Sequence, residues 1–205
     1  MNDNFQLPVN FPENVMLVDV ALLNREVASM HRSMSWGLKR ELPLIDMIQW
    51  ITCLGLDGDV TLYGQNTQVI FVHESPETRL SVAAQPDFLH EDGASFFVPE
   101  VNKFDLSSVH PAGFTDTSHL YFDLMHILLD SKDVKNLMLL YSPDLYGPSV
   151  RDELLRLAAE NGPEAVSKAC LYEFGPAALN KYPYRQVNVI MSLAHVFGIK
   201  REDVE

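Results

Sequence analysis

Apolar residues along this chain fall into two patterns, short continuous runs and longer stretches with helical spacing. Residues 15–23 form an almost unbroken apolar run that contains one acid, Asp19, and its length and valine content predict a strand buried on both faces. Comparable runs predict strands at residues 134–141 and 169–174. Because helical patterns alternate with these later runs, we expect parallel β-α units.

The stretches with helical spacing predict amphipathic helices. We expect Asn24 to cap the first helix and Pro43 to open the second, with Gly55 just past the end of the second. Thr117 or Ser118 is expected to cap the third helix. The expected helices cover residues 25–39, 43–54, 118–130, 149–161 and 184–197.

The middle of the chain has shorter strand signals. Residues 60–63 and 69–72 have strand-like sequences, and the loop between them predicts an antiparallel hairpin. Residues 73–117 are irregular because four prolines break any long helix, with short strands expected at residues 80–84 and 95–98.

Together these patterns predict an α/β fold with a mostly parallel or mixed sheet flanked by helices. The antiparallel hairpin and an irregular acidic insertion at residues 73–117 are additions to that sheet. We expect one domain over residues 1–205, with residues 1–12 as an extended arm.

Composition agrees with a globular chain and excludes several classes of protein. Of the 205 residues, 47% are apolar and 21% are charged, which is enough apolar surface for a core. No apolar run approaches the roughly 20 residues that span a bilayer, and the first residues resemble no secretion signal, so we expect no membrane partner. Cys53 and Cys170 lie in apolar runs, which indicates buried thiols in a reducing, cytoplasmic compartment.

Charge is distributed unevenly along the chain. The formal net charge is −13, and residues 41–130 hold fourteen acids but only two bases, Arg79 and Lys103. Such a surface disfavours nucleic acid as a partner, because affinity for a phosphate backbone comes largely from Lys and Arg. The acidic segment either keeps the protein soluble or binds a cation or a basic protein partner, and a homo-oligomer is a further expectation.

No standard catalytic motif occurs in the sequence. The chain lacks GxGxxG, GxxxxGK[ST], GxSxG, HExxH and an EF-hand loop, so no cofactor can be assigned from motifs. We therefore favour a binding or regulatory module over an enzyme.

One helix face has the composition of a metal site. His119, Asp123, His126 and Asp130 follow one another at i, i+4, i+7 and i+11, so they share a face of the expected helix. Imidazole nitrogens and a carboxylate one turn apart can hold Zn²⁺ or Mn²⁺. The alternative is the solvated face of an amphipathic helix, opposite an apolar stripe. Five of the seven histidines lie in residues 73–126, which fits either interpretation.

A second candidate site joins Asp19 to the loop at residues 142–149. An isolated carboxylate in an apolar strand is costly unless it is paired or bound. The loop leaves a strand at its carboxyl end, where open parallel sheets bind ligands. We expect a ligand to contact Asp19 and four loop residues, Ser142, Asp144, Tyr146 and Ser149. Alternatively, Asp19 caps a helix or pairs with Arg25, and the loop residues form only a turn and a cap.

These two segments resemble part of the PIN/NYN-type nucleases, which place acids after a first strand and after a later strand. The matching residues are Val18-Asp19 with Asn24, and Ser142-Pro143-Asp144. The resemblance implies a metal-dependent hydrolase, a nuclease or phosphohydrolase, that uses Asp19 and Asp144. The sequence departs from the family pattern in its longer spacing from Asp19 to Asn24 and in lacking a second acid at the usual offset after Asp144.

Overall fold

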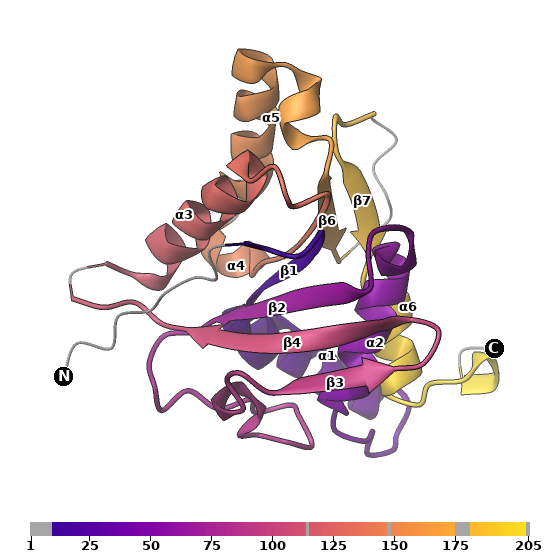
Figure 1. Ribbon diagram of the computed structural model, residues 1–205. Coiled ribbons are helices and arrows are strands. Elements are labelled where there is room, and N and C mark those ends of the chain that lie inside the picture. The colour runs from indigo at the N-terminus through magenta and orange to yellow at the C-terminus, as the bar shows by residue number, and fades with distance from the viewer. Residues whose placement is uncertain (1–9, 114, 147–148, 175–180, 204–205) are drawn as a thin grey trace.

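A computed structural model of the protein describes residues 10–113, 115–146, 149–174 and 181–203. Its strands form one seven-stranded sheet in the order β3-β4-β2-β1-β5-β6-β7 (Figure 1). Every neighbouring pair is parallel except β3 and β4, which confirms the expected α/β class with a mostly parallel sheet. The strands are β1 (Asn14–Asp19), β2 (Asn66–Val72), β3 (Ser95–Val98), β4 (Asn102–Val109), β5 (Asn136–Leu140), β6 (Ala169–Glu173) and β7 (Arg185–Asn188).

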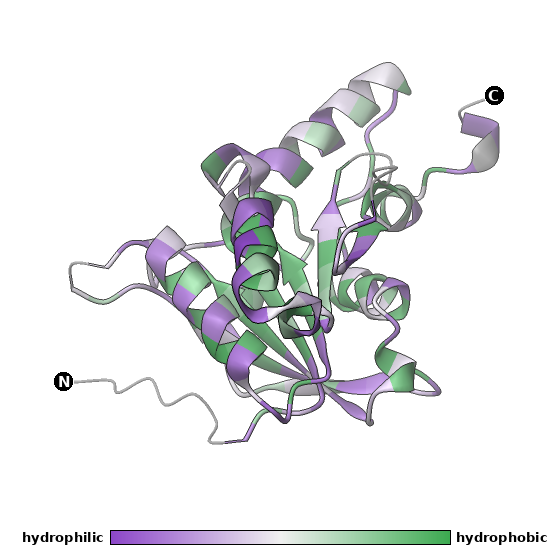
Figure 2. Ribbon diagram, turned by 90° about the horizontal axis from the view of Figure 1, so that it is seen from above, coloured by the Kyte–Doolittle hydropathy of each residue, from purple (hydrophilic) through white to green (hydrophobic). Residues whose placement is uncertain are grey.

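Helices cover both faces of the sheet, so the central strands are buried on both sides (Figures 1 and 2). Along β1, Met16 and Val18 point into one core and Val15 and Leu17 into the other, as the two-residue period of a strand requires. The first core contains α1 (Ala28–Gly37), α2 (Met47–Asp57) and α6 (Ile190–Val196). The second core contains α3 (Thr117–Asp130), α4 (Pro143–Tyr146) and α5 (Ser149–Asn161).

The strand order places a topological switch point between β1 and β5. From β1 the chain adds β2 and β4 on one side of the sheet, then returns to add β5, β6 and β7 on the other side. In open parallel sheets a crevice forms at the carboxyl ends of the strands at such a point. A ligand-binding site is therefore expected at the carboxyl ends of β1 and β5.

The strand expected at residues 15–23 ends earlier than its apolar pattern indicated. β1 stops at Asp19, and the remaining apolar residues begin a helix that includes a π-helical segment, η1 (Leu22–Val27), before α1. Asn24 is not a cap, since it lies inside η1. Its side-chain nitrogen donates to the Arg79 carbonyl at 2.8 Å and its oxygen accepts from the Ser81 backbone nitrogen at 2.8 Å, which attaches residues 79–81 to this helix.

The prediction of an antiparallel hairpin at residues 60–72 is wrong. Val60–Leu62 is a 3-10 turn, η2, and β2 pairs in parallel with both β1 and β4. The one antiparallel pair among the described residues is β3 with β4, inside the segment expected to be irregular. The strand expected at residues 80–84 is reduced to a single bridge between Ala83 and Ile45.

Helix boundaries differ from expectation where a capping residue decides them. Asp46, not Pro43, starts α2, because its carboxylate accepts from the Gln49 backbone nitrogen at 3.1 Å. Gly55 lies inside α2. Asp116 caps α3 in place of Thr117 or Ser118.

Most of the later elements lie where they were expected, and one prediction is wrong. α5, β5 and β6 lie where they were expected, and the 3-10 turn η4 (Pro163–Val166) follows α5. The helix expected at residues 184–197 is instead β7 followed by the shorter α6, and the 3-10 turn η5 (Arg201–Asp203) comes after it. Among the described residues, no helix combines the length and hydropathy needed to cross a membrane.

Candidate functional site at the topological switch point

Asp19 and Ser142 meet where β1 and β5 end. Asp19 is the last residue of β1, and its side chain is fully buried. Its carboxylate accepts one hydrogen bond from the Ala21 backbone nitrogen at 3.0 Å and another from the Ser142 backbone nitrogen at 3.2 Å. Asp19 therefore caps the helix that follows it and fixes the loop after β5, while Arg25 is not its partner.

Burial decides the acidity of Asp19. Loss of solvation raises the pKa of its carboxyl to about 6, although the backbone hydrogen bonds from Ala21 and Ser142 act in the opposite direction. The Tyr146 hydroxyl is close enough to Asp19 for burial and that negative charge to raise the tyrosine pKa. It has no partner in hydrogen-bond geometry, however.

Glu26 occupies the position between the two predicted acids, and sequence reasoning missed it. The Ser142 hydroxyl donates to its Oε1, and the Asp144 backbone nitrogen donates to the same atom at 3.3 Å. Its other oxygen, Oε2, is buried without a partner. In sequence Glu26 is one of several polar residues on an amphipathic helix, and nothing in the local pattern distinguishes it from its neighbours.

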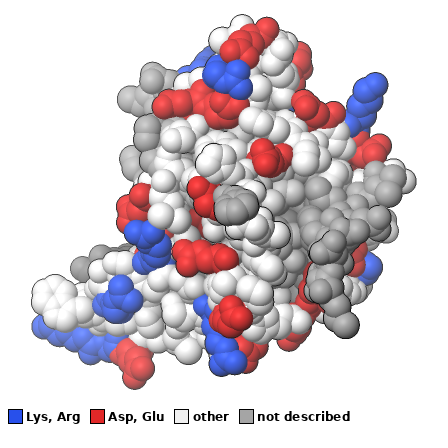
Figure 3. All heavy atoms as spheres, turned by 90° about the vertical axis from the view of Figure 1, so that its left-hand side faces the viewer, with Lys and Arg blue, Asp and Glu red and all other residues white. Residues whose placement is uncertain are grey.

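A cleft of about 720 Å³ opens between this helix and the loop after β5. We call it the switch-point cleft. Figure 3 shows the side of the molecule at which β4 ends, and there acidic and basic side chains are interspersed. One wall comes from η1 and α1, and the other comes from α4 and the end of β6. The first wall carries Arg25, Glu26, Ser29 and Arg32, and the second carries Asp144 and Phe174.

The predicted ligand residues divide between the cleft and its surroundings. Asp144 is exposed and lines the cleft. Asp19, Ser142 and Tyr146 are buried and support the two walls. Ser149 is exposed at the first position of α5.

Several buried polar atoms have no hydrogen-bond partner among the described residues. Tyr146 stacks on Tyr121 with ring centroids 5.3 Å apart, and both hydroxyls are unpartnered. Arg151 pairs with Glu173 at the end of β6, but its Nε is unpartnered, as is the hydroxyl of Tyr184 beside this pair. Of these unpartnered atoms, only Glu26 Oε2 belongs to a residue that lines the cleft, and the three tyrosines belong to the second core. The remaining unpartnered atoms, Trp50 Nε1 and Thr67 Oγ1, are separate from this group.

The histidines of the expected metal face have local partners. The ring Nδ1 of His119 lies 2.9 Å from Asp116, the cap of α3, and the ring Nε2 of His126 lies 2.7 Å from Glu153 of α5. Asp123 and Asp130 are exposed on α3. Over the part of the chain that the structure describes, no three or more His, Cys, Asp or Glu side chains are arranged to hold a metal ion. Metal binding on this face stays a prediction.

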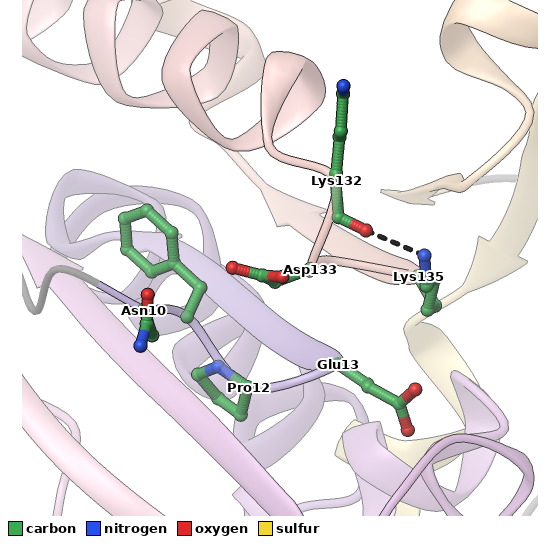
Figure 4. Close-up of a pocket in the computed structure, with 7 residues that line it drawn as sticks. Asn10, Pro12, Glu13, Lys132, Asp133 and Lys135 are labelled. Atoms are coloured by element: carbon green, nitrogen blue, oxygen red, sulfur yellow. Dashed lines mark hydrogen bonds between the residues drawn. The ribbon is translucent and has the colours of Figure 1, made fainter.

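A second hollow, of about 430 Å³, lies at the opposite edge of the sheet (Figure 4). It lies between the segment that enters β1, at Pro12 and Glu13, and the turn that enters β5, at Lys132 and Lys135. The Lys135 ammonium donates to the Lys132 carbonyl at 2.6 Å, and the Lys135 backbone nitrogen donates to the Glu13 carbonyl at 2.8 Å. These contacts join two segments of the fold.

Comparison with known proteins identifies a family without assigning an activity. No curated protein and no solved structure matches the chain. One family model, described as a family of unknown function (DUF6621), matches residues 8–204, which is nearly the whole chain. The protein with this seven-stranded sheet and switch-point cleft therefore belongs to the DUF6621 family.

Proposed function

We propose that this protein is a binding module whose small polar ligand occupies the switch-point cleft. The observation that carries the proposal is the position of Glu26, which lines the cleft and has one buried carboxylate oxygen, Oε2, without a partner among the described residues. Native proteins leave few such atoms unsatisfied, because each costs about 1–3 kcal/mol. A donor group of a ligand, or a water that accompanies it, would supply the missing partner.

The residues that line the cleft indicate a ligand with both donors and acceptors. Glu26 Oε2 can only accept, so it requires a donor. The guanidinium groups of Arg25 and Arg32 can only donate, and the hydroxyl of Ser29 can do either. A position at the carboxyl ends of parallel strands is where such ligands bind in doubly wound sheets.

The alternative of a metal-dependent hydrolase has less support from the geometry. It would need Asp19 as a ligand, yet Asp19 is fully buried and does not line the cleft. Asp144, the second acid of the PIN/NYN resemblance, is separated from Asp19 by Ser142 and Glu26.

Native mass spectrometry of the purified protein, followed by a thermal-shift screen of small metabolites, tests the proposal. We expect either a retained small molecule or a metabolite that raises the melting temperature by mass action. Glu26→Gln should weaken that binding. The variant has an N–H donor in place of the acceptor Oε2, and this donor would face the donor of the ligand. Glu160→Gln, which makes the same change at an exposed position of α5, is the matched control.

Two results would contradict the proposal. One is a bare polypeptide mass together with no stabilising compound in the screen. The other is a bound compound whose affinity is the same in wild type and in Glu26→Gln.

A further inference from the structure

The arginines of this protein fall into two groups. The structure describes the side chains of seven arginines, and five of them form ion pairs with carboxylates. Arg25 and Arg32 make no ion pair or side-chain hydrogen bond with any described residue, although the chain has 28 acids and only 15 bases. Both line the switch-point cleft. The paired arginines are Arg40, Arg79, Arg151, Arg156 and Arg185.

We propose that the ligand of the switch-point cleft carries an anionic group, a phosphate or a carboxylate, which Arg25 and Arg32 bind. This inference rests on the proposed function and specifies its ligand class. Guanidinium groups present several N–H donors in a fixed plane that matches the oxygens of both anions. Ser29 and Ser33 line the same wall, and their hydroxyls add donors between and beside the two arginines.

The two acids of the cleft lining fix the orientation of this ligand. Glu26, on the same wall as Arg25, meets Asp144 of the opposite wall, and both would repel an anion placed against them, so the anionic group lies toward Arg25 and Arg32. The unpartnered Oε2 of Glu26 requires a donor, so the other end of the ligand carries a hydroxyl or an amine. Met30 and Phe174 supply apolar contact in the same cleft.

Matched compounds that differ only in charge test this assignment. The first set is glycerol, glycerol 3-phosphate and glycerate, and the second is adenosine and AMP. We expect the anionic members to raise the melting temperature at about millimolar concentration and the neutral members to leave it unchanged. Comparison of glycerol 3-phosphate with glycerate shows whether the anion is a phosphate or a carboxylate.

Arginine variants connect the effect to the cleft. The Arg25→Gln/Arg32→Gln double variant should bind the anionic members at least about tenfold more weakly, since each charged hydrogen bond contributes roughly that factor or more. The Arg40→Gln/Arg156→Gln double variant removes the same charge from two arginines outside the cleft lining, and it should retain wild-type affinity.

Each outcome decides between this inference and the proposed function. Equal binding of neutral and anionic members, or equal affinity of the Arg25→Gln/Arg32→Gln variant, overturns the anion assignment and leaves the binding function intact. If no member of either set binds, the charge of a molecule retained in native mass spectrometry decides: an anion lost from the double variant supports the assignment, and a neutral molecule overturns it. No binding and no retained molecule overturn both.

Discussion

The buried carboxylate of Asp19 joins the end of β1 to the loop that follows β5. Its position in an apolar strand predicts a partner, and the structure supplies two backbone N–H groups, from Ala21 and Ser142. It thus acts as the helix cap that the sequence left as an alternative. Because Asp19 holds the loop from which Asp144 enters the cleft, it positions the site without lining it.

The raised pKa of Asp19 predicts a specific pH dependence of stability. In the unfolded chain this carboxyl has a pKa near its ordinary value of 3.8, and in the folded protein the pKa is about 6. Between these values the folded state binds more protons, so Asp19 lowers the free energy of unfolding as pH rises through this window. Asp19→Asn removes that contribution. The free energy of unfolding of the variant, measured relative to that of wild type, should therefore rise by roughly 2 kcal/mol from about pH 4 to about pH 7.

Urea denaturation of both proteins at several pH values checks this prediction, because the difference between them cancels the titration of all other groups. The absolute stability of Asp19→Asn is less informative, since the amide leaves one of the two backbone donors without its acceptor. Asp144→Asn is the control from the same loop, with an exposed side chain, and should change stability by less than about 1 kcal/mol. If the difference in the free energy of unfolding between Asp19→Asn and wild type stays constant with pH, the raised pKa of Asp19 is contradicted.

At the scale of elements, the contact of α2 with the sheet depends on the absence of a side chain at Gly55. A Cβ atom placed there would lie 3.1 Å from Phe104 Cζ and 3.3 Å from Val60 Cγ2, and both neighbours are fully buried. Gly55 is thus retained inside the helix for close packing against β4, although glycine is a poor helix former.

Gly55→Ala should consequently destabilise the protein by about 1 kcal/mol, because overpacking of a rigid contact exceeds the gain in helix propensity. Gly37→Ala is the matched control: Gly37 ends α1 with no atom within 4 Å of its added Cβ, so this change should be neutral or slightly stabilising. Thermal or urea denaturation of the two variants gives the comparison. Stabilisation by Gly55→Ala to the same extent as by Gly37→Ala would show that Phe104 moves aside easily.

The elements that sequence could predict are those whose pattern was long and uninterrupted. β5, β6, α3 and α5 follow from apolar periodicity with a clear stop, such as Gly162-Pro163 after α5. The errors occur where a pattern fits two structures. The run after Asp19 is as apolar as a strand but turns into η1. Residues 60–63 include two β-branched residues and one aromatic residue, yet residues 60–62 form a 3-10 turn.

The site was predictable only in part for a related reason. The sequence analysis joined Asp19 to the loop at residues 142–149, and the structure brings Asp19 and Ser142 into contact and places Asp144 in the cleft lining. Glu26, Arg25 and Arg32 were not predicted as site residues, because the sequence marks them only as polar positions of an amphipathic helix. The other wall of the cleft comes from a distant segment, at Asp144, and local spacing does not reveal that contact. Which arginines are unpaired depends on contacts between distant segments, as in the pairing of Arg40 with Asp203.

For the whole molecule, the acidic segment at residues 41–130 has many separate structural roles. Asp46 and Asp116 cap helices, Asp92 accepts from the Ser108 backbone nitrogen, and Asp59 pairs with Arg185. These acids are distributed over several elements. The large negative charge therefore acts mainly as a diffuse field around the protein, which repels extended polyanions and is screened by salt.

This field distinguishes a small anion from a nucleic acid. Two unpaired arginines in a cleft can bind one phosphate group, but a polynucleotide would also bring neighbouring phosphates toward a protein with a net charge of −13. At about 0.15 M salt we expect no measurable binding of single-stranded RNA or duplex DNA in fluorescence anisotropy, even at about 10 μM protein. The Arg25→Gln/Arg32→Gln variant should give the same flat titration. Micromolar binding that falls steeply with salt and disappears in this variant would instead make the switch-point cleft a nucleic-acid site and favour the nuclease-like alternative.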